Sequence, residues 1–169
     1  AVIPVLISGS ALNPAQPDKG TTIAVLDLSA YKEALIQVQE SERLAHAVLN
    51  ALSTHVAILD ENGVILAVNE AWRKFAAENG GALERLTEGI NYLAICDQAQ
   101  GSHAEGAADF AEGVRTVLRG ACEQFTQDYP CHSIKEQRWF MGRVIRLTGE
   151  GPTRVLVAHE PINTNTPPA

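Results

Sequence analysis

Apolar and polar residues in the middle of this sequence follow the pattern of a strand, a tight turn, a second strand and the start of a helix. Val56–Leu59 is a short apolar run, and Val64–Val68 is a second one rich in β-branched residues, which favour strands. The segment between them, Asp60–Gly63, ends in Asn-Gly, a dipeptide typical of hairpin turns. Asn69 lies where a helix N-cap belongs, with Trp72 one helical turn further on. The stretch predicts the opening of a small domain that contains both strands and helices.

Helical patterns follow this opening, and strands come after them. Apolar residues recur at helical spacing in Glu70–Glu78 and Ala107–Leu118, with a shorter apolar piece at Ile90–Cys96. Three predicted strands close the domain, separated by turns rich in Pro or Gly: Glu123–Tyr129, Gln137–Leu147 and Arg154–Glu160. This order predicts an α+β fold, with a five-stranded antiparallel sheet and the helices gathered on one face.

Residues 2–28 contain two further apolar runs, Val2–Ile7 and Thr21–Leu28, joined by a loop with Pro and Gly. A two-stranded ribbon is marginally stable by itself. It is either an N-terminal hairpin packed on the main domain or the end of a preceding domain, and we favour the second explanation.

A long helix is predicted from Ser29 to Leu52, because this stretch has no Gly or Pro and begins beside residues that favour N-caps. A spacing of alternately three and four residues selects mostly apolar positions: Tyr31, Leu35, Val38, Glu42, Ala45, Leu49 and Leu52. The pattern fits a coiled-coil seam, or an amphipathic helix folded onto its own domain. Glu42 either weakens the seam and permits switching, or is exposed in a slightly shifted register, which we prefer.

Composition narrows the classes of partner. The formal net charge is −7 and the basic residues are not clustered, which argues against nucleic acid and anionic membranes as partners. No apolar run reaches the roughly 20 residues that span a bilayer, and the first residues do not form a signal peptide. The chain lacks an initiator Met, which suggests a piece of a longer protein. Three irregularly spaced cysteines suggest reduced thiols and a cytoplasmic location.

Five pieces of the sequence, taken in order, resemble the PAS domain family, the small sensory domains of bacterial signalling proteins. They are the opening Val56–Trp72, then Gly-Ile-Asn-Tyr-Leu at 89–93, Tyr-Pro-Cys-His-Ser at 129–133, Arg-Trp-Phe with Arg-Val at 138–144, and Val-Ala-His-Glu-Pro-Ile-Asn at 157–163. Residues 2–29 resemble the last two strands of a second such domain, closing on Asp27-Leu28-Ser29 in place of the usual Asp-Ile-Thr.

This resemblance implies a tandem arrangement. Residues 1–28 would be the C-terminal strands of a preceding PAS domain, 29–52 a connecting signalling helix, 53–163 the PAS domain and 164–169 a tail or linker. The main domain departs from the family where it closes on Pro161-Ile162-Asn163, because Pro161 replaces the Asp that couples the last strand to an output helix.

The sequence contains no recognisable catalytic motif. It has no P-loop, no G-x-G-x-x-G and no nucleophile elbow. Cys131 and His132 are adjacent, so on a strand they point to opposite faces and do not share a metal ion. An enzyme that uses Cys131 and His132 as a nucleophile pair is a weak interpretation. We expect neither catalytic nor metal-binding residues in this chain.

The sequence identifies no cofactor, and the resemblance leaves non-covalent flavin or haem open. Some PAS domains hold haem on a single His, for which His103 is the candidate, although a solvated loop histidine is the simpler reading. Light-sensing members use a Cys followed by Arg-Phe-Leu-Gln, whereas Cys96 is followed by Asp-Gln-Ala and is expected to be a small buried hydrophobe. Trp72 could stack on a flavin ring. The other histidines are expected to be structural or exposed: His55, His132 and His159.

Arg143 is the most informative polar residue, because strand alternation places it on an otherwise apolar face with Trp139. A cation there needs an anionic partner, either a ligand or, as we prefer, Asp109 or Glu112. The expected ligand pocket comprises Trp72, Tyr92, Cys96, Phe110, Val114, Trp139 and Arg143. The residues expected to relay a signal are Asp27, Glu42 and Leu49.

The sequence therefore predicts a cytoplasmic PAS sensor and dimerisation module from a multidomain protein of the sensor histidine kinase or diguanylate cyclase type. The fragment itself would not be an enzyme. A small molecule or partner surface would bias the helix pair of a homodimer, and through it an output domain. The alternative is a ligand-free structural dimerisation module, which a pocket with convergent polar groups would argue against.

Overall fold

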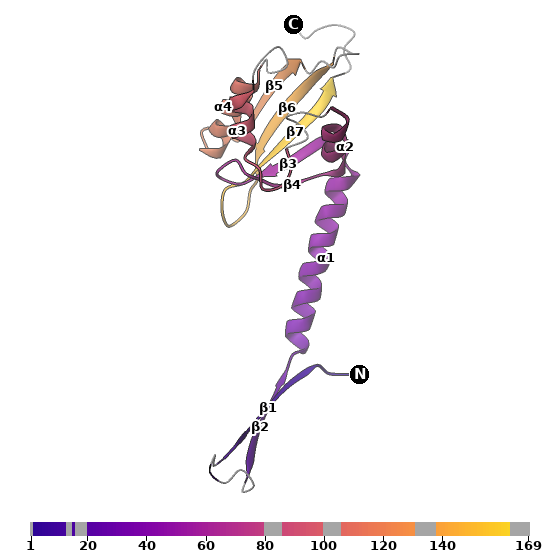
Figure 1. The fold of residues 1–169 in the computed structure, drawn as a ribbon, viewed down its shortest axis with the longest axis vertical. Coiled ribbons are helices and arrows are strands. Elements are labelled where there is room, and N and C mark those ends of the chain that lie inside the picture. Colours follow the sequence, from indigo (N-terminus) through magenta and orange to yellow (C-terminus); the bar gives the residue numbers. More distant parts are fainter. Residues whose placement is uncertain are drawn as a thin grey trace. The chain divides into compact units, whose positions relative to one another are not determined.

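The computed structural model describes residues 2–12, 15, 20–79, 86–99, 106–130 and 138–162 (Figure 1). The chain forms two compact units, residues 1–47 and 48–169. The first unit contains β1 (Val5–Ala11), β2 (Thr21–Asp27) and most of α1 (Ser29–Ala51).

Strands β1 and β2 pair antiparallel, from Val5 opposite Asp27 to Ala11 opposite Thr21. The sequence pattern ended the first strand too early, because Ser8–Ala11 continues the ladder despite its small and polar side chains. After β2, the carboxylate of Asp27 accepts a hydrogen bond from the Ser29 amide at 2.8 Å. Hydrogen bonds from Ser29 lower the pKa of Asp27. Asp27 therefore stabilises the start of α1, as its residue type predicts.

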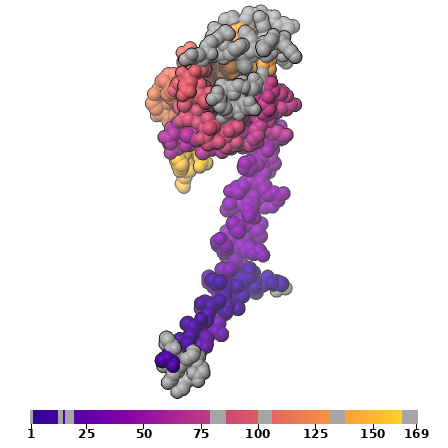
Figure 2. All heavy atoms as spheres, in the orientation of Figure 1, coloured from indigo at the N-terminus to yellow at the C-terminus, as the bar shows by residue number. Residues whose placement is uncertain are grey.

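Helix α1 has no buried residue, and its side chains are uncovered on the face shown in Figure 2. In the predicted seam, Tyr31 is 69% exposed and Val38 is 55% exposed. Leu44, which lies off the seam, is 67% exposed. Helix pairing stays a prediction.

The second unit is built on a five-stranded antiparallel sheet in the order β4-β3-β7-β6-β5. Its strands are β3 (His55–Leu59), β4 (Ile65–Val68), β5 (Gln124–Pro130), β6 (Trp139–Arg146) and β7 (Val155–Ile162). Its helices are α2 (Glu70–Asn79), α3 (Tyr92–Gln98) and α4 (Ala107–Leu118). The arrangement confirms the predicted α+β fold, with strands at both ends of the unit's sequence and helices between them (Figure 1).

The turn between β3 and β4 has the chemistry that the sequence predicts. The Gly63 amide donates to the Asp60 carbonyl at 3.0 Å, and Gly63 has a φ of 78°, which glycine adopts without strain. The Asp60 carboxylate accepts hydrogen bonds from the amides of Asn62 and Val64. These bonds fix the hairpin that begins the sheet.

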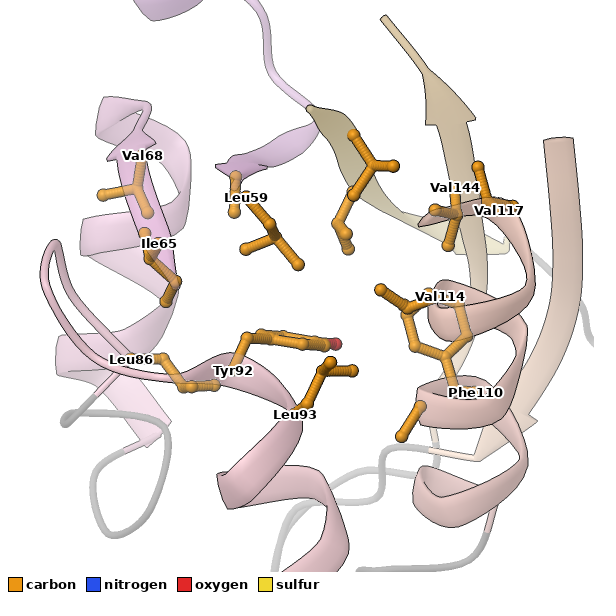
Figure 3. Packing of buried hydrophobic residues seen from close by; sticks show 14 of the residues in the cluster. Leu59, Ile65, Val68, Leu86, Tyr92, Leu93, Phe110, Val114, Val117 and Val144 are labelled. Carbon is orange, nitrogen blue, oxygen red and sulfur yellow. The ribbon is translucent and has the colours of Figure 1, made fainter. Parts of the chain in front are cut away.

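The hydrophobic core lies between the sheet and the helices (Figure 3). Two glycines let aromatic rings lie directly against backbone there. A Cβ on Gly142 of β6 would lie 2.9 Å from Cζ of Phe110, and a Cβ on Gly113 of α4 would lie 2.6 Å from Cζ of Phe125. Helix α4 is therefore packed closely on the sheet. No helix among the described residues is both long and apolar enough to cross a membrane.

Candidate functional site

Two histidines lie side by side on the face of the sheet that the helices cover. His55 of β3 is paired with His159 of β7, and His159 is also paired with Gly142 of β6. Paired residues of antiparallel strands project to the same face. Because Gly142 and Phe110 touch on that face, both histidine side chains lie on the helix side of the sheet.

His159 is hydrogen-bonded to two tyrosines from different elements. Its Nδ1 lies 2.8 Å from the hydroxyl of Tyr129 on β5, and its Nε2 lies 3.2 Å from the hydroxyl of Tyr92 at the start of α3. A neutral imidazole has one donor and one acceptor nitrogen, so one tyrosine accepts from the ring and the other donates to it. The three side chains form one continuous hydrogen-bonded chain.

Aromatic rings surround this chain. The His159 ring lies 5.2 Å from Phe110 of α4 and 5.5 Å from Trp72 of α2, measured between centroids. The Trp72 indole N–H donates to the Leu86 carbonyl at 2.8 Å, which fixes the ring. Figure 3 shows the Tyr92 ring crossing the core with its hydroxyl end directed toward α4.

His55 extends the aromatic surface on the other side. Its ring stacks on Phe75 at 4.4 Å and lies 5.8 Å from Phe140. Its Nδ1 is buried and has no hydrogen-bond partner among the described residues. We define the His159 cluster as His55, Trp72, Phe75, Tyr92, Phe110, Tyr129, Phe140 and His159.

The polar groups of the cluster are uncharged near neutral pH. Burial, with a smaller contribution from His55, lowers the pKa of His159 to about 3. Burial also raises the pKa of Tyr92 well above its usual value. Cys96 is hydrogen-bonded to Tyr92, and burial raises the pKa of its thiol to about 11. The thiol is therefore protonated near neutral pH, and Cys96 is half-buried against the core rather than fully buried as expected.

The structure brings together some of the residues predicted to line a pocket. Trp72, Tyr92 and Phe110 belong to the His159 cluster, Cys96 adjoins Tyr92, and Val114 is fully buried in the adjoining core.

Trp139 and Arg143 do not lie with these residues, and their placement in the pocket was wrong. They alternate along β6 with Phe140, Gly142 and Val144, which face the helices, so their own side chains project from the opposite face. Among the described residues no ion pair joins Arg143 to Asp109 or Glu112, and Glu112 bonds Arg119 at 2.6 Å, so the expected partner of Arg143 stays a prediction.

The sequence interpretation gave His159 no role beyond a structural or exposed one and passed over Tyr129. Alternation along β7 carried the missing signal, since His159 shares a face with the apolar Val155 and Val157. His103, Cys131 and His132 lie outside the described residues. Among those that are described, no group of three His, Cys, Asp or Glu side chains could hold a metal ion.

The architecture matches known structures. The PAS domain of BvgS from Bordetella pertussis superimposes with a TM-score of 0.53, 12% identity, and coverage of 75% of this chain and 89% of that chain. The second unit has the PAS fold. The phage VqmA–DPO complex superimposes with a TM-score of 0.51 and 17% identity, covering 74% of this chain and 54% of that chain. RsLOV D109G superimposes with a TM-score of 0.51 and 14% identity, covering 76% of this chain and 72% of that chain. At these identities the likeness concerns the PAS fold alone.

No family model matches the sequence. One curated relative, an uncharacterized 104.1 kDa protein in the hypE 3′ region of Rhodobacter capsulatus, is 36% identical over 138 residues, or 80% of this chain. The chain spans 14% of that relative's length.

Proposed function

We propose that this PAS unit is a sensor module that binds a small molecule at the His159 cluster. The observation that carries the proposal is the chain Tyr92–His159–Tyr129, with bonds of 3.2 and 2.8 Å on the helix-facing side of the sheet. Ligand sites in proteins combine apolar and aromatic walls with a few convergent polar groups, and this cluster has that composition.

The ligand class follows from the chemistry of the cluster. Its rings offer flat apolar surfaces, and its polar groups are neutral hydroxyl and imidazole groups. A charged ligand would lose its hydration without gaining an opposite charge from these groups. We therefore propose an uncharged, flat molecule that donates and accepts hydrogen bonds.

The cofactors left open by the sequence fit this cluster differently. Both ring nitrogens of His159 are engaged by tyrosine hydroxyls, so His159 is a poor haem ligand. Cys96 lacks both the adduct motif and a reactive thiolate, which argues against a covalent flavin. A non-covalent flavin would have to stack on rings such as Trp72, whose indole N–H is already bonded.

The chain would act as one module of a longer cytoplasmic signalling protein of the histidine kinase or diguanylate cyclase type. Its small share of the 104.1 kDa relative supports a multidomain parent. Helix α1 would pair with its copy in a homodimer and pass the change to an output domain, and the fragment itself would not be catalytic. Residues 1–28 would close a preceding PAS domain.

A second candidate is a ligand-free dimerisation module. The observation that favours it is the row of exposed apolar side chains along α1, such as Leu35 at 46% and Val38 at 55%. In that case the His159 cluster would be core packing only.

An ultraviolet–visible spectrum with native mass spectrometry of the purified chain tests the sensor proposal. We expect a mass increment that is lost in His159→Phe, which keeps a ring but removes both nitrogens. A flavin or haem band would identify the ligand class and direct attention to Trp72 or His103. A colourless protein at its sequence mass, after incubation with a small-molecule extract of bacterial cells, would favour the ligand-free module.

A further inference from the structure

The end of helix α1 is held by a side chain from elsewhere in the chain. The last carbonyls of a helix lack partners within the helix and are commonly satisfied around a C-terminal glycine. Here Leu-Ser-Thr follows Ala51, with no glycine. Instead, the amide nitrogen of Asn69 donates to the carbonyls of Leu49 at 3.1 Å, Leu52 at 3.3 Å and Thr54 at 2.8 Å.

The same side chain also starts the next strand and the next helix. The Asn69 oxygen accepts from the Val56 amide at 3.0 Å and from the Trp72 amide at 3.0 Å. Asn69 is polar, yet its exposed fraction is only 1%. The predicted N-cap of α2 is thus confirmed. The side-chain oxygen of Asn69 caps α2, and its side-chain nitrogen bonds the carbonyls at the end of α1.

Asn50, on the last turn of α1, makes a corresponding bond to the start of α2. Its side-chain oxygen accepts from the Glu70 amide at 2.9 Å, which is another of the unpaired amides at the start of α2. Each asparagine therefore satisfies backbone groups of the other's helix end. We call this pair, Asn50 and Asn69, the asparagine clasp.

The clasp is connected to the His159 cluster through one residue. Trp72, whose amide is bonded by Asn69, packs its ring against His159 at 5.5 Å and Tyr92 at 6.2 Å. A displacement of Trp72 therefore shifts the first turn of α2. That shift changes the bonds that Asn69 makes to the end of α1 and the bond that Asn50 of α1 makes to Glu70 of α2.

We propose that the asparagine clasp couples the His159 cluster to the last turn of α1, with Asn50 and Asn69 acting as positioning residues. This inference rests on the proposed sensor function, for which it supplies the route from the site to the helix. It assigns the relay to backbone hydrogen bonds at residues 49–54. The side chains expected from the sequence, such as Glu42, lie outside this route.

Amide hydrogen exchange measured by NMR on the intact chain tests the coupling without any ligand. Tyr92→Phe perturbs the cluster, because it removes the hydroxyl bonded to His159 and keeps the ring. The reporters are the amides of Leu52, which donates to the Leu49 carbonyl, and Glu70, which donates to Asn50. We expect Tyr92→Phe to change their protection by about two- to tenfold, the range that weakening one hydrogen bond produces.

Asn50 gives the control backgrounds, because it is exposed and its substitution leaves the core intact. In Asn50→Ala the effect of Tyr92→Phe on Leu52 should shrink at least twofold, and in Asn50→Asp, which keeps the accepting oxygen, it should return. Thr126→Ala, an exposed hydroxyl loss on β5, should leave both reporters unchanged in every background. If Tyr92→Phe does not fold, Tyr129→Phe removes the other partner of His159.

Unchanged reporters in Tyr92→Phe, or an equal change with and without Asn50→Ala, would overturn the coupling. Neither result depends on whether a ligand is found. A failed ligand search with intact coupling would therefore reject the proposed function and keep the clasp.

Discussion

His159 acquires its properties from three elements that meet around it. Tyr129 of β5 and Tyr92 of α3 bond its two nitrogens, and rings of α2 and α4 pack against the half-buried imidazole. An isolated histidine titrates near pH 6.5, whereas burial lowers the pKa of this one to about 3. At the scale of the residue, the cluster is thus neutral, and its neutrality can be measured.

The free energy of unfolding should fall as the pH is lowered from about 6.5 towards 3. In that interval the unfolded chain binds a proton at residue 159 that the folded chain does not bind, so His159 contributes a slope of at most about 1.4 kcal/mol per pH unit. His159→Gln keeps a donor and an acceptor for the two tyrosines but does not titrate, so it should flatten the slope. Urea unfolding between pH 4 and pH 8 measures the difference.

His46→Gln supplies the matched control, since His46 is exposed on α1. It should leave the slope as in the wild type. An equal slope in the wild type and in His159→Gln would show that His159 is not buried in its neutral form.

Individual residues were predictable where local chemistry decides their role. Asp60 and Gly63 form the predicted turn, and Asn69 forms the predicted N-cap, because each acts within a few residues of itself. Arg143 was misplaced, and the two tyrosine partners of His159 were not foreseen, because both depend on which face of a strand meets the helices. That choice is made by packing between distant segments such as α4 and β6.

At the scale of elements, α1 presents an apolar surface that the described chain leaves uncovered. The order and type of the main elements were predictable, because apolar periodicity differs between helices and strands. The strand ends were displaced by up to a few residues, as for β1. There, small polar residues continue the backbone ladder without contributing an apolar pattern.

Leu35→Glu should dissociate a homodimer if the seam on α1 is real. A charge at the seam would be buried on pairing without a partner, which weakens association by roughly tenfold or more. Light scattering over a range of concentrations measures the mass. Leu44→Glu introduces the same charge at an exposed position off the seam and should leave the dimer intact.

Two results would contradict the seam. If the wild-type protein is a monomer, α1 does not pair through the predicted seam. Equal dissociation by Leu35→Glu and Leu44→Glu would show that pairing, if present, uses a different face of α1.

At the scale of the whole molecule, the PAS unit contains a neutral aromatic cluster that includes Trp72. The Trp72 amide is bonded to Asn69, which in turn bonds the end of α1. In the sensor that we propose, this arrangement connects the ligand site to the helix expected to carry the signal. The resemblance of five sequence pieces to PAS domains led us to expect a sensor-type domain. Local sequence patterns did not predict the Tyr92–His159–Tyr129 chain, because those residues are 30 or more positions apart.

The central claim is that the His159 cluster binds small, uncharged aromatic molecules. Saturation-transfer difference NMR tests it most directly, with phenol, indole and 2-pyridone as probes and benzoate as the charged control. We expect saturation of at least one neutral probe by the wild-type protein, a loss of most of that signal in His159→Phe, and little signal from benzoate. No saturation of any neutral probe, or equal signals from the wild type and His159→Phe, would contradict the account and leave the cluster as core packing.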